Sequence, residues 1–232
     1  MRSKLFFRGL KDGIPIAMGY LAVAFTLGIA AANIDMNAFQ SFLMSFGMLA
    51  SAGEYAAIIL IGSAAGVLEM IATTVIINLR YFLMSCSLSQ KVSPDTPMWK
   101  RMLLAWFVTD ELFGISSAVD GPLDPVYTYG AALVSVTGWC LGTVLGVIAG
   151  DILPARLASA MNVALYGMFL AIIIPPARKS RFMAVLIVVS MAASFIFANA
   201  PVLSGISEGF RIIILTVLIA GIAAFVRPVK EG

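Results

Sequence analysis

The chain alternates long apolar runs with short polar segments, and the length of these runs is the first guide to its structure. A bilayer core of about 30 Å needs roughly 20 apolar residues per helix. Runs of about this length recur, and Pro, Gly or charged residues stand at most junctions between them. They predict about eight transmembrane helices, at 13–33, 39–61, 64–89, 101–118, 126–149, 156–174, 182–199 and 210–226. Because the boundary near Gly62 carries no charge, a count of seven stays open.

Composition agrees with a protein that lies in lipid. Hydrophobic residues make up 61% of the 232 residues and charged residues 12%, against about 25% charged in soluble domains. We therefore expect an all-α integral membrane protein with one membrane domain over 1–232. The net charge of +3 is modest and the basic residues stand mostly at helix ends, so no nucleic-acid partner is expected. The two cysteines lie in apolar runs and there is no His, so no metal or cofactor is expected.

The basic residues also predict the orientation, because Lys and Arg in short loops are in excess on the cytoplasmic side. If eight helices cross, nine basic residues fall on the side of the N-terminus and five on the other. The nine are Arg2, Lys4, Arg8, Lys11, Arg178, Lys179, Arg181, Arg227 and Lys230, and the five are Lys91, Lys100, Arg101, Arg156 and Arg211. We expect a multi-pass protein of the cell (inner) membrane with a cytoplasmic N-terminus.

A weak internal repeat appears when the chain is shifted by 84 positions. The shift aligns Tyr55 with Trp139, Gly62 with Gly146, Gly66 with Gly150 and Asn78 with Asn162. It predicts a three-helix unit at 13–89, a second of opposite topology at 101–174, and two further helices at 182–226. Inverted repeats of this kind are typical of secondary transporters.

The main candidate for chemistry is Arg80, which lies well inside the predicted helix 64–89. A central Arg costs roughly 2.5–3.5 kcal/mol to insert on translocon scales. A cavity or a counter-charge normally compensates this cost. The planar guanidinium group can hold a carboxylate through two parallel hydrogen bonds, so a substrate anchor is one interpretation and a structural ion pair is the other. Asn78 and Tyr81 lie beside it on a polar stripe.

Two further segments carry polar residues at membrane depth. Asp110 and Glu111 fall in the middle of the predicted helix 101–118. Because helix neighbours point about 100° apart, one of them can face a substrate while the other faces a helix.

The predicted helix 39–61 is rich in small residues just before Gly53 and Glu54. Such residues permit close packing, but they also permit a break whose free NH groups can bind a carboxylate. Gly138, Gly142, Gly146 and Gly150 recur every four residues, which predicts a tight helix–helix contact.

Four segments resemble the AzlC-type branched-chain amino acid permease family. They are GIPIAMGYLAVAFTLGI at 13–29, ASAGEYAAIILIG at 50–62, NLRYFLMSCSLS at 78–89 and TDELFGI at 109–115. The resemblance implies a secondary transporter that exports branched-chain or related amino acids. It also implies a smaller membrane subunit of the AzlD type as partner.

Residues and resemblance together predict an amino acid exporter that is driven by proton exchange or by the gradient of its own substrate. Arg80 would hold the carboxylate, and Asp110 or Glu111 would hold the ammonium group and carry the proton. An ion channel or small-ion carrier and a non-transporting accessory subunit stay open. We do not expect an enzyme, because an intramembrane aspartyl protease needs two membrane aspartates and only Asp110 is central.

Overall fold

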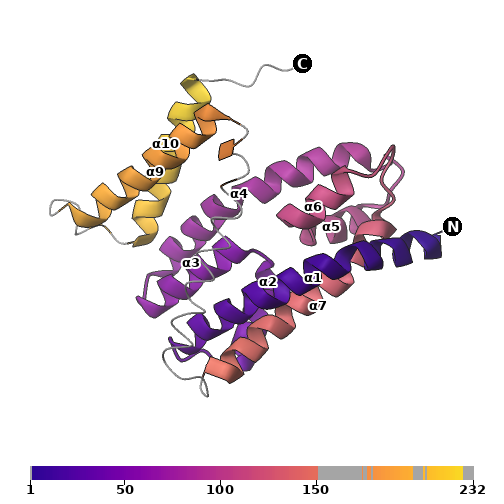
Figure 1. Cartoon of the computed structure of the whole chain (residues 1–232), viewed down its shortest axis with the longest axis horizontal. Helices are drawn as coiled ribbons and strands as arrows, with labels where there is room; N and C mark the ends of the chain where they lie inside the picture. Colours follow the sequence, from indigo (N-terminus) through magenta and orange to yellow (C-terminus); the bar gives the residue numbers. More distant parts are fainter. Residues whose placement is uncertain are drawn as a thin grey trace. The chain divides into compact units, whose positions relative to one another are not determined.

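A computed structural model describes residues 2–150, 174, 177–178, 180–200, 206 and 208–226 (Figure 1). The elements of these residues are α-helices, and the only β pairing among them is an isolated bridge between Val92 and Leu123. The helices are α1 (Arg2–Ala32), α2 (Ala38–Met48), α3 (Ser51–Gly62), α4 (Val67–Lys91), α5 (Met98–Trp106), α6 (Asp110–Ser117), α7 (Pro125–Gly150), α9 (Arg181–Asn199) and α10 (Glu208–Val226). They fall into two compact units, whose described residues are 2–55 with 77–150 and 56–76 with 174–226.

Helices α1 and α7 run side by side in the same direction and form the core of the first unit (Figure 1). A Cβ on Gly138 would lie 2.5 Å from the carbonyl oxygen of Ala17, and one on Gly146 would lie 2.1 Å from that of Phe25. Since no Cβ fits at these positions, glycine is what lets the two backbones approach. The tight contact predicted for the glycine ridge is confirmed, and its partner is α1.

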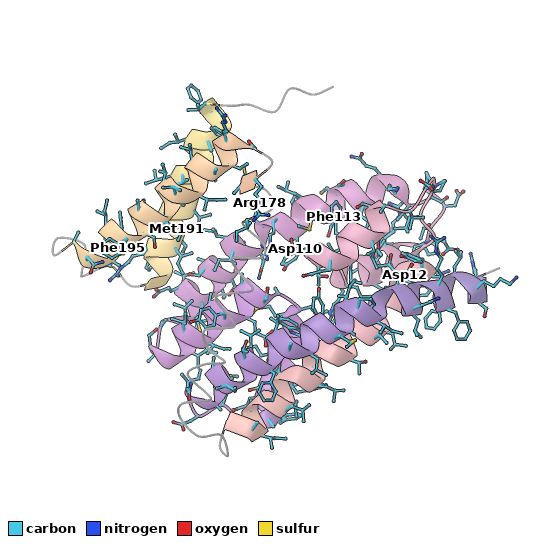
Figure 2. The ribbon with its side chains drawn as sticks, in the orientation of Figure 1. Asp12, Asp110, Phe113, Arg178, Met191 and Phe195 are labelled. Carbon is cyan, nitrogen blue, oxygen red and sulfur yellow. The ribbon has the colours of Figure 1, made fainter. Side chains whose placement is uncertain are left out.

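Helix α1 begins earlier than the predicted helix 13–33 because charged residues extend it. Arg8 pairs with Asp12 one turn later at 3.8 Å, and Asp12 also accepts a hydrogen bond from Tyr127 of α7 at 2.9 Å. Arg2 lies 3.6 Å from Asp124, just before α7 begins. Asp12 stands on the N-terminal part of α1 (Figure 2). The N-terminal ends of α1 and α7 are therefore held together by charged and polar contacts.

Helices α5 and α6 form a hairpin whose two ends lie at the same end of α4. Arg101 of α5 donates to the carbonyl of Ser93 at 2.9 Å, and Lys91 Nζ donates to the carbonyl of Ser117 at 2.6 Å. The chain turns at 107–109 between the two helices. The single helix predicted for this run is therefore wrong, because the segment enters the apolar layer and returns.

The predicted helix 39–61 is also broken, into α2 and α3. Helix α2 ends at Leu49, which takes the left-handed conformation with φ 46°, and α3 begins two residues later. The break that the small residues before Glu54 indicated is confirmed. A non-glycine residue in this region of φ marks a sharp, specific change of direction.

The break in α2–α3 fixes how often the chain crosses the membrane before α5. The chain leaves α1 at Ala32, and Lys91 lies at the opposite end of the α1–α7 pair, where its carbonyl accepts from Leu123 N at 2.8 Å. An odd number of crossings must separate these points. Helix α4, with 25 residues, is long enough to supply one, whereas α2 and α3 have 11 and 12. We therefore predict that α4 crosses and that α2–α3 enters and returns on the side where α1 ends.

Four of the described helices are long and apolar enough to cross a membrane. They are Arg2–Ala32, Val67–Lys91, Pro125–Ala149 and Arg181–Asn199, and α10 is a shorter apolar helix. In the second unit α9 and α10 pack against each other and match the predicted helices 182–199 and 210–226. The predicted helix 156–174 lies, apart from its last residue, outside the described residues. The predicted count of eight is therefore not confirmed, since the structure breaks the predicted helices 39–61 and 101–118.

The order of the elements favours a different internal offset from the one that the sequence suggested. The 84-residue shift pairs the broken α2–α3 segment with the continuous α7. In contrast, α5, α6 and α7 begin 60, 59 and 58 residues after α2, α3 and α4. Each set is a pair of short helices followed by a long helix. The inverted repeat stays a prediction, with an offset near 59 as its better form.

Candidate functional site

The candidate site is the stretch of α4 from Asn78 to Tyr81, which contacts both hairpins. Arg80 Nη2 lies 3.2 Å from Asp110 Oδ2 and donates to the hydroxyl of Tyr81 at 3.2 Å. The guanidinium also lies over the Tyr81 ring, 5.0 Å from its centroid. About a third of each side chain of the ion pair is exposed, at 33% for Arg80 and 31% for Asp110. The described residues therefore leave part of the pair uncovered.

The acidic partner comes from the first turn of α6, at the tip of its hairpin. Thr109 is the N-cap of this helix, and its side chain accepts from Leu112 N at 3.3 Å. Asp110 and Glu111 follow in the first turn, where carboxylates are favoured by the helix dipole. The side chain of Asp110 stands at this start of α6 (Figure 2). Both residues therefore mark a helix N-terminus, and the expectation that they lie mid-helix is wrong.

The other hairpin meets α4 through Gly53. A Cβ on Gly53 would lie 2.5 Å from Asn78 Nδ2 and 2.8 Å from Asn78 Oδ1, so only glycine permits this approach. The contact places the first turn of α3 against α4 just before Arg80. Residues 78–81 thus carry contacts from the first turns of two short helices, α3 and α6.

Glu54, in the same first turn of α3, is fully buried and belongs to a separate polar cluster. Its Oε1 is hydrogen-bonded to Ser45 Oγ, and its Oε2 accepts from Trp139 Nε1 at 3.0 Å. Ser45 Oγ lies 2.7 Å from Thr143 Oγ1, which in turn donates to the carbonyl of Trp139 at 3.2 Å. This cluster joins α2, α3 and α7 at the first helix break.

Tyr20 of α1 connects the two sets of residues. Its hydroxyl lies 2.6 Å from both Thr109 Oγ1 and Glu111 Oε2. Its ring packs edge-to-face on Trp139, with centroids 5.2 Å apart. A continuous series of contacts therefore leads from Glu54 through Trp139 and Tyr20 to the first turn of α6.

Two polar atoms of the candidate site have no hydrogen-bond partner within the described part of the chain. They are Asn78 Oδ1 and Arg80 Nε, both buried. Buried polar atoms are almost always paired in folded proteins, so each exception needs an explanation. Arg80 Nε can still donate one hydrogen bond and Asn78 Oδ1 can still accept one, which is what a site for a polar ligand requires.

The structure brings together most of the residues that the sequence named. Arg80, Asp110 and Tyr81 are in direct contact, and Gly53 contacts Asn78. Glu111 is linked to them through Tyr20 and the first turn of α6, whereas Glu54 is held in its own cluster.

The sequence analysis missed the residues that complete the network: Tyr20, Ser45, Thr109, Trp139 and Thr143. A hydroxyl or indole group in the middle of an apolar run was the available signal. It is weak, because each of these side chains also packs well in an apolar core.

Comparison with known proteins gives the family. The AzlC protein family matches residues 15–153 of this chain, which is more than half of it. An uncharacterized membrane protein of Archaeoglobus fulgidus is 31% identical over 176 residues, which cover 75% of this chain and 77% of the relative. Inner membrane protein YgaZ of Escherichia coli K12 is 26% identical over 153 residues, covering 64% of this chain and 62% of YgaZ. No solved structure matches the chain. This chain is a membrane protein that belongs to the AzlC family.

Proposed function

We propose that this membrane protein is a secondary transporter that exports branched-chain or related amino acids. The observation that carries the proposal is the ion pair between Arg80 and Asp110 at the meeting point of two helical hairpins. Both residues are partly exposed, and Arg80 Nε is unpartnered in the described residues. A zwitterion with one carboxylate and one ammonium group matches a site with one cation and two acids.

The roles of the side chains follow from their charges. Arg80 Nε, which has no partner in the described residues, would donate to the substrate carboxylate, and a second N–H group of the same planar guanidinium would complete the pair of hydrogen bonds. Asp110 and Glu111 would bind the ammonium group. The positive ends of two helix dipoles, at the starts of α3 and α6, lie near the carboxylate position, as in transporters built from broken helices. Exposed apolar residues of α4, such as Leu79, suit a branched side chain.

The proposal includes a cytoplasmic N-terminus in the cell inner membrane. The ends of α1, α4, α5 and α7 that lie together carry a concentration of basic residues, namely Arg2, Lys4, Arg8, Lys11, Lys91, Lys100 and Arg101. In the sequence-based topology three of these fell on the opposite side. Their grouping supports a cytoplasmic location for this side under the positive-inside rule.

The proposal also includes a small AzlD-like membrane subunit. The glycine ridge of α7 is occupied by α1, so such a partner would have to bind another surface. The protein should therefore be prepared both alone and after co-expression with a small hydrophobic protein encoded beside it.

The proposal is tested by leucine counterflow in liposomes with wild type, Arg80→Lys, Arg80→Ala and Asp110→Asn. Hydrogen bonds to charged groups are worth about 1.5–3 kcal/mol. We therefore expect both Arg80 variants to weaken leucine binding by about tenfold or more. Arg80→Lys fails because an ammonium group cannot form the planar fork. Arg101→Lys is the matched control, because Arg101 donates only to backbone carbonyls that a Lys can also reach.

The double variant Arg80→Ala/Asp110→Asn separates a binding role from a structural one. If the pair binds substrate, Arg80→Ala remains folded, and removing both charges improves the folded yield of Asp110→Asn, which otherwise leaves a cation without its partner. An unstable Arg80→Ala protein that binds leucine with unchanged affinity would show that the ion pair is structural and the proposal is wrong.

A further inference from the structure

We propose that Glu54 is the site of the coupling proton, and that its protonation and deprotonation in each transport cycle reverse the donor order of two neighbouring hydroxyl groups. This inference rests on the proposed transport function and moves the proton away from Asp110 and Glu111. It is carried by the geometry of the cluster at the first helix break. The coupled species is one proton taken up from water on one side and released on the other.

The carboxyl group of Glu54 is fully buried without a compensating cation. Its residue is 0% exposed, and no ion pair joins it to any described Lys or Arg. Its partners are the Ser45 hydroxyl and the Trp139 indole, neither of which carries a charge. A buried carboxylate of this kind depends wholly on neutral donors to offset the cost of burying its charge.

None of the described groups that face Glu54 is a second carboxyl group. From α7 they are Trp139, Thr143 and the thiol of Cys140, and from α2 Ser45. Helix α1 contributes Tyr20, which is separated from the carboxyl group by the Trp139 ring. Helix α4 contributes the neutral amide of Asn78 next to Gly53.

Counting the hydroxyl protons shows that the cluster has two arrangements. Ser45 and Thr143 each have one proton to donate. When Thr143 donates to the Trp139 carbonyl, Thr143 must accept from Ser45, and Ser45 must then accept from Glu54. This order requires a protonated Glu54. In this order Glu54 donates a hydrogen bond to Ser45, Ser45 donates to Thr143, and Thr143 donates to the Trp139 carbonyl of α7.

The opposite order requires a charged Glu54. Thr143 then donates to Ser45, Ser45 donates to the carboxylate, and the Trp139 carbonyl loses its side-chain donor. Trp139 Nε1 donates to Oε2 in both states. Addition of one proton therefore forms one covalent O–H bond on Glu54 and reverses the donor direction of two hydroxyl groups. No other covalent bond of the protein forms or breaks.

The two arrangements bear on the conformation of the helix break. Ser45 and Glu54 lie on either side of the turn at Leu49, so their hydrogen bond bridges α2 and α3. Hydrogen bonds to a carboxylate are about twice as strong as neutral ones. Protonation thus loosens the bridge that holds the tip of this hairpin against α7. The contacts through Trp139 and Tyr20 give this change a physical connection to the substrate site.

Glu54→Gln is the informative substitution, because a glutamine amide reproduces the neutral arrangement. Its NH₂ group can donate to Ser45, and its oxygen can accept from Trp139. We expect this variant to exchange leucine when the amino acid is present on both sides of the liposome. It should lose accumulation driven by a pH gradient, and leucine-dependent proton movement, read with a trapped pH-sensitive dye, should fall to the level of protein-free liposomes.

Two serines of α2 give a matched pair of variants. Ser45→Ala removes the hydroxyl that bonds Glu54, whereas Ser41 is equally buried one turn earlier and its hydroxyl has no partner in the described residues. We expect Ser45→Ala to reduce proton-driven accumulation strongly. Ser41→Ala should behave as wild type.

A spectroscopic titration tests the proton site without relying on the transport assay. Infrared difference spectra between acid and alkaline pH distinguish the carbonyl stretch of a protonated carboxyl group from that of a carboxylate. We expect a band of the wild-type protein that is missing in Glu54→Gln and altered in Ser45→Ala. If wild type shows the Glu54 band but no leucine counterflow, the transport function fails while the proton site stands. If the band persists in Glu54→Gln, or if that variant still couples leucine to protons, this inference is wrong.

Discussion

At the residue scale, the chemistry of this protein depends on side chains that bridge helices. Tyr20 is the clearest case, since its ring contacts Trp139 while its hydroxyl reaches Thr109 and Glu111. The Tyr20 side chain therefore links the Glu54 cluster to the first turn of α6.

Replacing Tyr20 by Phe keeps the ring and removes this link. We expect Tyr20→Phe to insert and fold, but to lower the rate of leucine counterflow by about tenfold, the effect of losing about 1.4 kcal/mol of hydrogen bonding to a charged group. The matched control is Tyr129→Phe, whose hydroxyl donates to the Lys100 carbonyl at 2.6 Å, apart from the site. Equal rates for the two variants would show that the Tyr20 hydroxyl has no role in transport.

At the element scale, close helix packing and helix breaks work together. Helix α1 fits against α7 because glycines on both helices leave no room for a Cβ. This rigid pair supports both hairpins, since α7 holds Glu54 and α1 holds the first turn of α6. The broken helices can then change conformation at their tips while the pair does not.

Two glycines of α1 test this packing. A Cβ on Gly28 would lie 2.1 Å from the Thr143 carbonyl oxygen, whereas Gly19 has no atom within 4 Å of its added Cβ. We expect Gly28→Ala to lower the melting temperature in detergent by several degrees, because overpacking costs about 1–3 kcal/mol. Gly19→Ala should leave it unchanged or raise it, since Ala favours helix over Gly by about 1 kcal/mol. A similar loss for both variants would contradict the close approach of α1 and α7 at Gly28.

At the scale of the whole molecule, the sidedness of the loops is the main result. The sequence-based topology placed Lys91 on the same side as Asn33 and opposite Asp120, because it treated both 39–61 and 101–118 as crossing helices. The structure places Lys91 Nζ on the carbonyls of Ser117 and Val119, next to Asp120. The loops before α5 and after α6 therefore share a side.

Cysteine labelling measures this arrangement directly. Single cysteines at Asn33, Asp95 and Asp120, which are all exposed, would be introduced after Cys86 and Cys140 are replaced by alanine. We expect an impermeant thiol reagent to reach positions 95 and 120 from the same side and position 33 only from the other. Labelling of positions 33 and 95 from the same side would contradict this arrangement and support the sequence-based topology.

Much of the fold and part of the site could be predicted from the sequence, and particular residues show why. Arg80 in an apolar run required a counter-charge, and Asp110 was one of two acids offered for it. Small residues before Glu54 indicated a break, because a helix without bulky side chains is easily interrupted there. Trp139 and Thr143 could not be assigned to Glu54, because they lie 85 and 89 residues away and only packing brings them together.

The sequence by itself determined that the chain lies in lipid, that its elements are helices, and that charged residues, Arg80 first among them, stand at membrane depth. These properties depend on local composition, because the cost of placing apolar and polar groups in lipid is decided residue by residue. Only the tertiary structure decided that two of the apolar runs fold back, which acid pairs with Arg80, and which hydroxyl groups meet Glu54. A run of about 20 apolar residues satisfies the bilayer equally well as one crossing helix or as two half-helices covered by protein. The choice between them depends on packing against α1, α4 and α7, which are remote in sequence and close in space.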